Sequence, residues 1–343
     1  MSWLKALGAT SPVVAAPMAG GPTTPELVLA AAGAGSLGFV AGGYLTADAL
    51  ADQLARVSTD TDLYGVNLFA PNPVPVDRAA YTAYRELIRA EAERYDVELP
   101  AAPVEDDDGW RDKVDLLLEH PVPVVSFTFG IPDARSLSAL RGVGSLLVQT
   151  VTSEDEARQA DAAGVDALAV QAGAAGGHSG TLTPDRIQPD RSLTDLVLEI
   201  GTVTELPMLA AGGIASSDDV AAVLAAGAAA VVVGTTLLLS DESGASSVHR
   251  TGLRDHDRET VVMRAWTGRP ARGLRNAFSD AYDASAPTGY PALHHLTRPI
   301  RRAAAAASDP ERVNLWAGTG FRAAREAPTA EILTGLAEVS PEW

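Results

Sequence analysis

The residues best suited to chemistry lie in a glycine-rich stretch near the middle of the chain. Residues 167–181 read ALAVQAGAAGGHSGT, an apolar run followed by a flexible turn that carries His178. An imidazole titrates near neutral pH and can serve as a general base. Glycines lack a Cβ, so the backbone at Gly176 and Gly177 can lie flat against a planar ligand. The stretch predicts a ligand site with His178 above the ligand. The alternative is a tight surface turn whose histidine only caps a neighbouring carbonyl.

Two further turns are typical of phosphate sites. Gly212 and Gly213 end one apolar run and precede a helical pattern, while Val233, Gly234 and Thr235 end the next apolar run. Backbone N–H groups in such turns and at helix N-termini bind phosphate. Each turn alone is equally consistent with ordinary helix capping. Two adjacent turns of this kind follow the last two predicted strands. If the strands form a (β/α)8 barrel, this is the usual place for a phosphate, so the turns predict phosphate binding.

Side-chain amides form a third group of candidates. Asn67, Gln149 and Gln171 lie in or at the ends of predicted strands, and amides offer donors and acceptors without charge. They suit the edge of a heteroaromatic ring such as a flavin, although each is also compatible with a polar residue that satisfies a neighbour inside the barrel. The residues after the first predicted strand complete the expected lining, namely Pro17, Met18 and Ala19.

These candidates lie in or just after predicted strands, in a chain that alternates β-rich runs with Ala-rich helical runs. The predicted strands span residues 12–18, 37–43, 64–70, 122–129, 145–151, 167–172, 207–212 and 230–235. Eight such units predict a (β/α)8 TIM barrel over residues 1–243, an α/β fold whose active face lies at the C-terminal ends of the strands. Residues 244–343 are expected to form a mainly helical elaboration that packs on the barrel and contributes to the rim of the site.

Composition disfavours several classes of partner and mechanism. The 26 Lys+Arg residues against 44 Asp+Glu give a formal charge of -18, which argues against nucleic acid and anionic membranes as partners. The chain has no Cys, so thiolate chemistry is excluded. No metal site is predicted, since the acidic run 105–108 lacks EF-hand spacing and reads as a solvated excursion. The histidines other than His178 are interpreted as structural. No apolar run has the length of a membrane span, and a cytoplasmic protein is expected.

Together these motifs resemble those of the nitronate monooxygenases, FMN-dependent TIM-barrel enzymes formerly called 2-nitropropane dioxygenases. The resemblance runs nearly from end to end. The motifs that carry it are VAAPMAG at 14–20, GVNL at 65–68, QAGAAGGHSG at 171–180, LAAGGI at 209–214, VGT at 233–235, TGRPARGLRN at 267–276 and LWAG at 315–318.

The resemblance implies an FMN across the barrel mouth and a specific role for the histidine. The FMN phosphate would be held by the turns at Gly213 and Gly234–Thr235, its ring would lie near Asn67 and Gln171, and His178 would be the catalytic residue. Members of the family oxidise alkyl nitronates with O2 to carbonyl compounds and oxidised nitrogen products. The histidine can also act as a base toward neutral nitroalkanes.

Two alternatives stay open at this point. An FMN barrel that uses NAD(P)H, such as an enoyl-ACP reductase or a quinone reductase, shares the Gly-Gly-His loop and the phosphate turns. A non-catalytic barrel that binds flavin or phosphate needs those turns but no titratable group over the ring.

One departure from the family concerns the substrate. Members that act on an anionic nitronate carry a C-terminal lysine near the substrate, and this chain lacks it. Arg269, Arg272 and Arg322 are the candidate replacements, with surface solvation as their alternative role. Trp316 is interpreted as an anchor of the tail to the barrel, with lining of the flavin pocket as the alternative.

Overall fold

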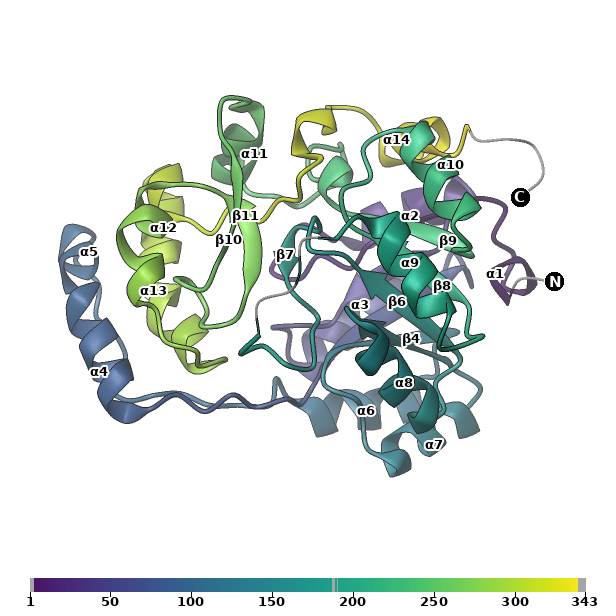
Figure 1. Ribbon diagram of the computed structural model, residues 1–343, viewed down its shortest axis with the longest axis horizontal. Helices are drawn as coiled ribbons and strands as arrows, with labels where there is room; N and C mark the ends of the chain where they lie inside the picture. Colours follow the sequence, from purple (N-terminus) through teal and green to yellow (C-terminus); the bar gives the residue numbers. More distant parts are fainter. Residues whose placement is uncertain (1–2, 187–188, 190, 339–343) are drawn as a thin grey trace.

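A closed barrel of eight parallel strands forms the centre of the computed structural model, which describes residues 3–186, 189 and 191–338 (Figure 1). Each strand pairs with the next along the chain, and the last pairs with the first. The barrel strands are β1 (Val13–Ala15), β2 (Gly38–Ala41), β3 (Tyr64–Ala70), β4 (Val124–Phe129), β5 (Leu146–Val151), β6 (Ala167–Gln171), β8 (Met208–Ala211) and β9 (Ala230–Val233). The predicted (β/α)8 fold is confirmed.

Helices cover the outside of the barrel, which explains why the strands are almost continuously apolar. They are α2 (Pro25–Gly33), α3 (Ala47–Ser58), α6 (Trp110–Glu119), α7 (Ala134–Gly142), α8 (Glu154–Ala163), α9 (Leu193–Gly201), α10 (Ser217–Ala225) and α14 (Thr329–Leu336). Local sequence fixes most of their starts. Thr24, Ser153 and Ser216, for example, each accept a hydrogen bond from a backbone N–H of the following first turn.

The last helix, α14, returns to the barrel from the C-terminal region. It packs against α2, α10 and β1, and so takes the place of an eighth barrel helix (Figure 1). Ile332, Leu333 and Leu336 join the core between the strands and the helices. The expected elaboration after residue 243 therefore contains a helix of the barrel itself.

The chain between β9 and α14 builds a lobe over the C-terminal ends of the strands. Its elements are η1 (Thr235–Leu237), α11 (Ser247–Arg254), β10 (Thr260–Met263), β11 (Ala271–Leu274), α12 (Ala277–Tyr282), η2 (Asp283–Ser285), α13 (Ala292–Ala306), η3 (Pro310–Arg312) and η4 (Phe321–Ala323). Strands β10 and β11 form an antiparallel sheet with β7 (Gly177–His178), which belongs to the glycine-rich loop. The sheet was not part of the predicted, mainly helical elaboration.

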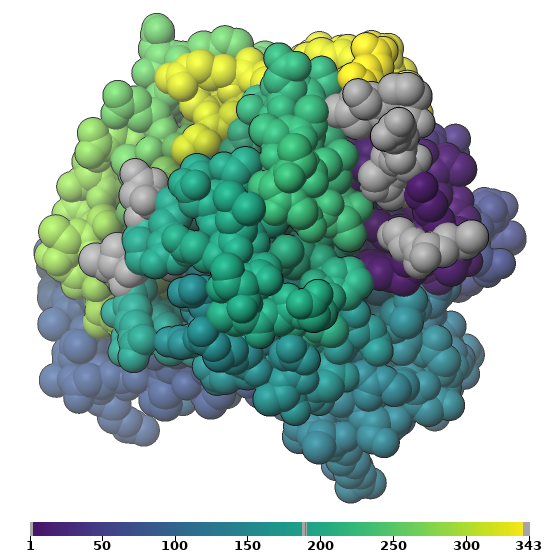
Figure 2. All heavy atoms as spheres, turned by 45° about the vertical axis from the view of Figure 1, so that its right-hand side comes forward, coloured from purple at the N-terminus to yellow at the C-terminus, as the bar shows by residue number. Residues whose placement is uncertain are grey.

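The helical segment that follows β3 packs against this lobe. The helical stretch after β3 divides at Ile88 into α4 (Arg78–Leu87) and α5 (Arg89–Arg94). Both helices lie beside α12 and α13, where the blue and yellow-green segments meet (Figures 1 and 2). Tyr84 is buried there and donates a hydrogen bond to the Ala265 carbonyl at 2.7 Å. Packing against residues distant in the sequence therefore fixes the position of α4 and α5.

The end of the acidic run after these helices contacts distant parts of the chain. Asp108 accepts a hydrogen bond from the backbone N–H of Tyr44 at 2.9 Å and from Lys113 at 2.6 Å. His295 lies 2.8 Å from a carboxylate oxygen of Asp106. The prediction of a solvated excursion is confirmed for residues 105–107, which are exposed. It is wrong only for Asp108, which its contacts with Tyr44 and the buried Lys113 hold partly out of solvent.

No helix in the part of the chain that the structure describes is long and apolar enough to cross a membrane.

Candidate active site

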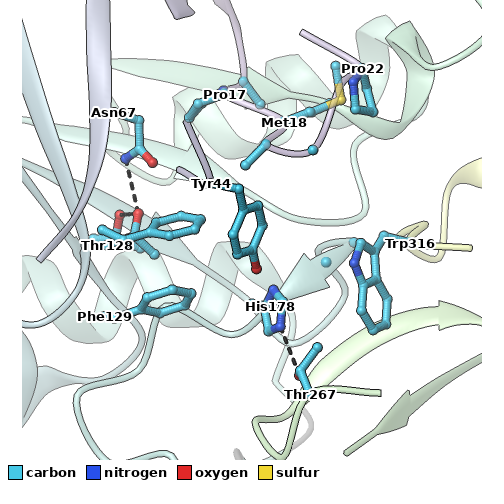
Figure 3. Close-up of a pocket in the computed structure, with 18 of the residues that line it drawn as sticks. Pro17, Met18, Pro22, Tyr44, Asn67, Thr128, Phe129, His178, Thr267 and Trp316 are labelled. Carbon is cyan, nitrogen blue, oxygen red and sulfur yellow. Dashed lines mark hydrogen bonds between the residues drawn. The ribbon is translucent and has the colours of Figure 1, made fainter. Parts of the chain in front are cut away.

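A cavity of about 1080 Å³ opens over the C-terminal ends of the strands, between the barrel and the lobe (Figure 3). This is the face that carries function in barrels of this kind. The sequence-predicted residues that line it are Pro17, Met18, Ala19, Asn67, Gln171, Gly176, Gly177, His178, Gly212, Gly213, Val233, Gly234 and Thr235.

Gln149 does not join them. Side chains alternate along a strand, and its neighbours Val148 and Thr150 face the cavity. Gln149 is fully buried on the other side of β5, where its amide donates to the Thr150 carbonyl at 3.0 Å. The prediction that Gln149 lines the site is wrong, because the position of a residue along a strand does not by itself give the face on which it lies.

The turn after β8 has the geometry of an anion cradle. Gly212 has φ 126° and Gly213 has φ 80°, conformations that side chains rarely adopt. Within the described part of the chain, the N–H groups of Gly213 and Gly234 have no hydrogen-bond acceptor. The start of α10 itself is already capped, because the Asp219 carboxylate accepts from the backbone N–H of Ser216 at 2.9 Å. The groups available to a phosphate are therefore those of the glycine turns.

The two amide side chains at the cavity have different roles. Asn67 donates through its NH2 group to Ser126 and Thr128, at 2.9 and 3.0 Å. Its side-chain oxygen has no partner among the described residues and is available to a ligand. Gln171 instead donates to the His178 carbonyl at 3.1 Å and accepts from the Gly180 N–H at 2.6 Å. Gln171 therefore holds the glycine-rich loop in shape.

His178 is held in a small sheet and not in a free loop. It pairs with Ala271 of β11 across the antiparallel ladder. Its ring lies among aromatic side chains, 5.4 Å from Trp316, 5.6 Å from Tyr290 and 5.8 Å from Phe129 between ring centroids. The C-terminal lobe thus orients the residue that the sequence marks as catalytic.

A threonine of the lobe is the hydrogen-bond partner of this imidazole. Nε2 of His178 lies 2.9 Å from Oγ1 of the buried Thr267 (Figure 3). That hydroxyl also lies within hydrogen-bond distance of the Arg269 carbonyl, at 3.3 Å, and of the Arg269 N–H, at 3.4 Å. When its single proton goes to that carbonyl, its remaining acceptor position takes a proton from Nε2, since a hydroxyl has one donor and two acceptor sites. In that arrangement Nδ1 of His178 is unprotonated.

The surroundings also keep the ring neutral. Burial, then the positive charges of Arg269 and Arg301, lower the pKa of His178 to about 3. Arg269 is itself buried and lies 4.1 Å above the ring of Phe129. Its guanidinium donates to the carbonyls of Ser179 and Thr181 on the far side of the glycine-rich loop. A neutral imidazole with a free nitrogen is suited to accept a proton.

Of the arginines proposed to replace the missing lysine, none lines the cavity. Arg269 is buried in its wall, and Arg272 donates to the Gly173 carbonyl at 2.6 Å. Arg322 is exposed and donates to the carbonyls of His256 and Arg258. The arginines that line the cavity instead come from α13, namely Arg298, Arg301 and Arg302.

Five large side chains roof the cavity, namely Tyr44, Phe129, Tyr290, His294 and Trp316. From the sequence, Trp316 has pocket lining as its alternative role, His294 is interpreted as structural, and the other three are not identified. A spacing of four along a helix places Arg298 on the same face as His294, which is a weak signal once α13 is known to cross the barrel mouth.

With this geometry in hand, comparison with known proteins identifies the family. A family model described as nitronate monooxygenase matches residues 1–338. The chain belongs to the nitronate monooxygenase family. A probable nitronate monooxygenase of Staphylococcus aureus (strain Newman) is 33% identical over 331 residues, which cover 95% of this chain and 93% of the relative.

Solved structures give the same result. A nitroalkane oxidase from Streptomyces ansochromogenes is 42% identical with a TM-score of 0.92, over 98% of this chain and 97% of that chain. FabK from Thermotoga maritima is more distant, at 26% identity and a TM-score of 0.74 over 97% and 93% of the two chains. The family consists of flavin-dependent oxidoreductases that act on small molecules. The non-catalytic alternative is thereby set aside.

Proposed function

We propose that this protein uses FMN and O2 to oxidise alkyl nitronates, and neutral nitroalkanes after deprotonation, to carbonyl compounds and oxidised nitrogen products. The observation that carries the proposal is the neutral His178, with a free ring nitrogen, in the same cavity as the glycine turns. Membership of the nitronate monooxygenase family supports the same activity.

The residues present fit an FMN. Free N–H groups at Gly213 and Gly234 suit its phosphate, and the hydroxyl of Thr235 lies beside them. The unpartnered oxygen of Asn67 suits a ring N–H. A Cβ at Gly176 would lie 2.5 Å from the Gly318 nitrogen, so only glycine lets this loop pass the C-terminal segment. Bound there, FMN would accept electrons from the substrate and pass them to O2.

The protein's own residues would bind and orient the substrate and would deprotonate a neutral nitroalkane. His178 would take a proton from the carbon next to the nitro group through Nδ1, while Thr267 holds Nε2–H. A nitronate is already deprotonated, so it needs positioning and no base. The aromatic roof would exclude water from the reacting carbon.

An absorption experiment tests this function. The purified protein, expressed with ample flavin, is expected to show an oxidised flavin spectrum, and the released cofactor should be FMN by mass. Under anaerobic conditions an alkyl nitronate should bleach that spectrum faster than NADH does. A colourless protein that cannot be reconstituted with FMN would refute the proposal. Rapid bleaching by NADH alone would favour a reductase.

A further inference from the structure

Tyr44 stands over the cavity on a backbone that side chains normally avoid. It follows Gly42 and Gly43 beyond the end of β2, and its φ is 66°. The left-handed region brings the Cβ close to the following carbonyl and is rarely used by a large residue. Such conformations persist where the surrounding structure holds them, and they gather at functional sites.

A partly buried ion pair holds this conformation. The backbone N–H of Tyr44 donates to Oδ1 of Asp108 at 2.9 Å, and Oδ2 of the same carboxylate accepts from Nζ of Lys113 at 2.6 Å. Lys113 is one of two lysines in the chain and is 1% exposed. The acidic run thus connects the barrel helix α6 to the loop that carries Tyr44.

Packing then fixes the phenol ring. It stacks on His294 with ring centroids 4.4 Å apart and planes 4° apart, and it meets Phe69 edge-on at 5.2 Å. Arg301 holds His294 in turn by donating to its carbonyl at 2.7 Å. A tyrosine with little rotational freedom presents its hydroxyl at a set place.

The hydroxyl of Tyr44 retains a proton for a ligand. Tyr290 donates to it at 3.4 Å, which uses one acceptor position of the Tyr44 oxygen. Tyr44's own O–H has no acceptor among the described residues. Its hydroxyl points to the part of the cavity that holds His178 (Figure 3), and Tyr290 bridges the two through its ring contact with His178 at 5.6 Å.

We propose that Tyr44 is a catalytic residue whose hydroxyl donates a hydrogen bond to an oxygen of the substrate's nitro or nitronate group. This inference rests on the proposed function. When His178 removes the proton, the electron pair of the broken C–H bond moves to the nitro group, and the negative charge collects on its oxygens. A fixed donor at those oxygens stabilises the charge as it forms. A phenol keeps its proton at neutral pH, because its ordinary pKa is about 10.

Tyr44→Phe tests the proposal by removing only the hydroxyl. The ring keeps its stack on His294, so flavin content and melting temperature should stay at the wild-type values. The kcat/KM for a neutral nitroalkane should fall about 10- to 100-fold, the range for a lost hydrogen bond to a charged group. Tyr95→Phe is the matched control, because its hydroxyl bonds Asp309 outside the cavity, and it should behave as the wild type.

Calorimetric titration with nitrate, a planar anion with the geometry of a nitro group, measures binding without turnover. Nitrate should bind wild-type protein and bind Tyr44→Phe roughly tenfold more weakly, consistent with one lost hydrogen bond. Wild-type kinetics and nitrate affinity in Tyr44→Phe would overturn the proposal, as would loss of flavin from that variant or no nitrate binding by the wild type. Nitrate binding through Tyr44 without any nitronate oxidation would refute the proposed function instead. It would still support Tyr44 as a hydrogen-bond donor to a bound anion.

Discussion

The two sides of the cavity are built in opposite ways. The floor, at the ends of β8 and β9, offers mainly backbone, with glycines at Gly213 and Gly234 whose N–H groups have no acceptor among the described residues. The roof consists of large side chains such as Tyr44 and His294, which lie beside His178 and come from segments far apart in the chain. Short stretches of sequence produce the floor. The roof depends on contacts such as that between Tyr84 and Ala265.

Charge separates the two sides as well. On the floor, neutral backbone dipoles can bind an anion, and no permanent positive charge is needed there. Beside the roof, Arg269 is fully buried, and no carboxylate within the described structure forms an ion pair with it. Its positive charge helps to keep His178 neutral. The difference indicates that cofactor binding and proton transfer can be lost separately.

The largest expected effect is at His178, beside the roof. His178→Asn keeps a polar side chain but removes the base, so turnover of a neutral nitroalkane should fall by roughly 10² to 10⁴. FMN content and melting temperature should change little, because the floor is untouched. Oxidation of the matching nitronate should suffer less, since it arrives deprotonated. Steady-state rates for the pair, at equal FMN occupancy, measure this.

The pH profile provides the control for that experiment. Because the pKa of His178 is lowered to about 3, wild-type kcat/KM for a neutral nitroalkane should not decline near pH 6.5, where a solvated histidine would gain its proton. Full activity of His178→Asn on both substrates would place the base elsewhere in the cavity.

A smaller effect is expected on the floor. Gly213→Ala puts a side chain at φ 80°, which costs about 1 to 2 kcal/mol, and its Cβ would lie 3.2 Å from the Cβ of Ala174. FMN affinity should fall roughly tenfold as the turn shifts. Gly164→Ala is matched in conformation at φ 82°, but its Cβ would meet nothing within 4 Å.

Both alanine variants should therefore lose similar stability in thermal unfolding, and only Gly213→Ala should lose FMN in a dialysis titration. Equal FMN affinity in the two would mean that the turn after β8 does not hold the phosphate.

The last expected effect concerns stability in acid. Burial lowers the pKa of His178 to about 3 and that of His249 to about 4. As pH falls below about 6.5, the unfolded chain binds protons at these positions before the folded chain does, so stability is lost. Each histidine should contribute a decline of about 1.4 kcal/mol per pH unit toward its folded pKa.

Denaturant unfolding between pH 7 and pH 4 measures that slope. His249→Gln keeps a donor for the Trp316 carbonyl and should make the slope shallower. An unchanged slope would show that His249 is protonated as easily in the folded protein as in the unfolded one.

Sequence alone determined the barrel and most of its floor. Strand and helix periodicities, helix caps such as Ser153 and Ser216, and the glycine turns are local, and local pattern is what a single sequence records. His178 was identified for the same reason, from its place at the end of a glycine-rich turn after a strand.

Tertiary structure alone decided which way Gln149 faces, that Tyr44 and His294 stack, and that Asp108 contacts the loop of Tyr44. It also decided that Thr267 is the hydrogen-bond partner of the His178 ring. These features join residues up to 250 positions apart. Their positions depend on how the lobe packs over the barrel mouth. Periodicity, which describes neighbours along the chain, carries no information about that packing.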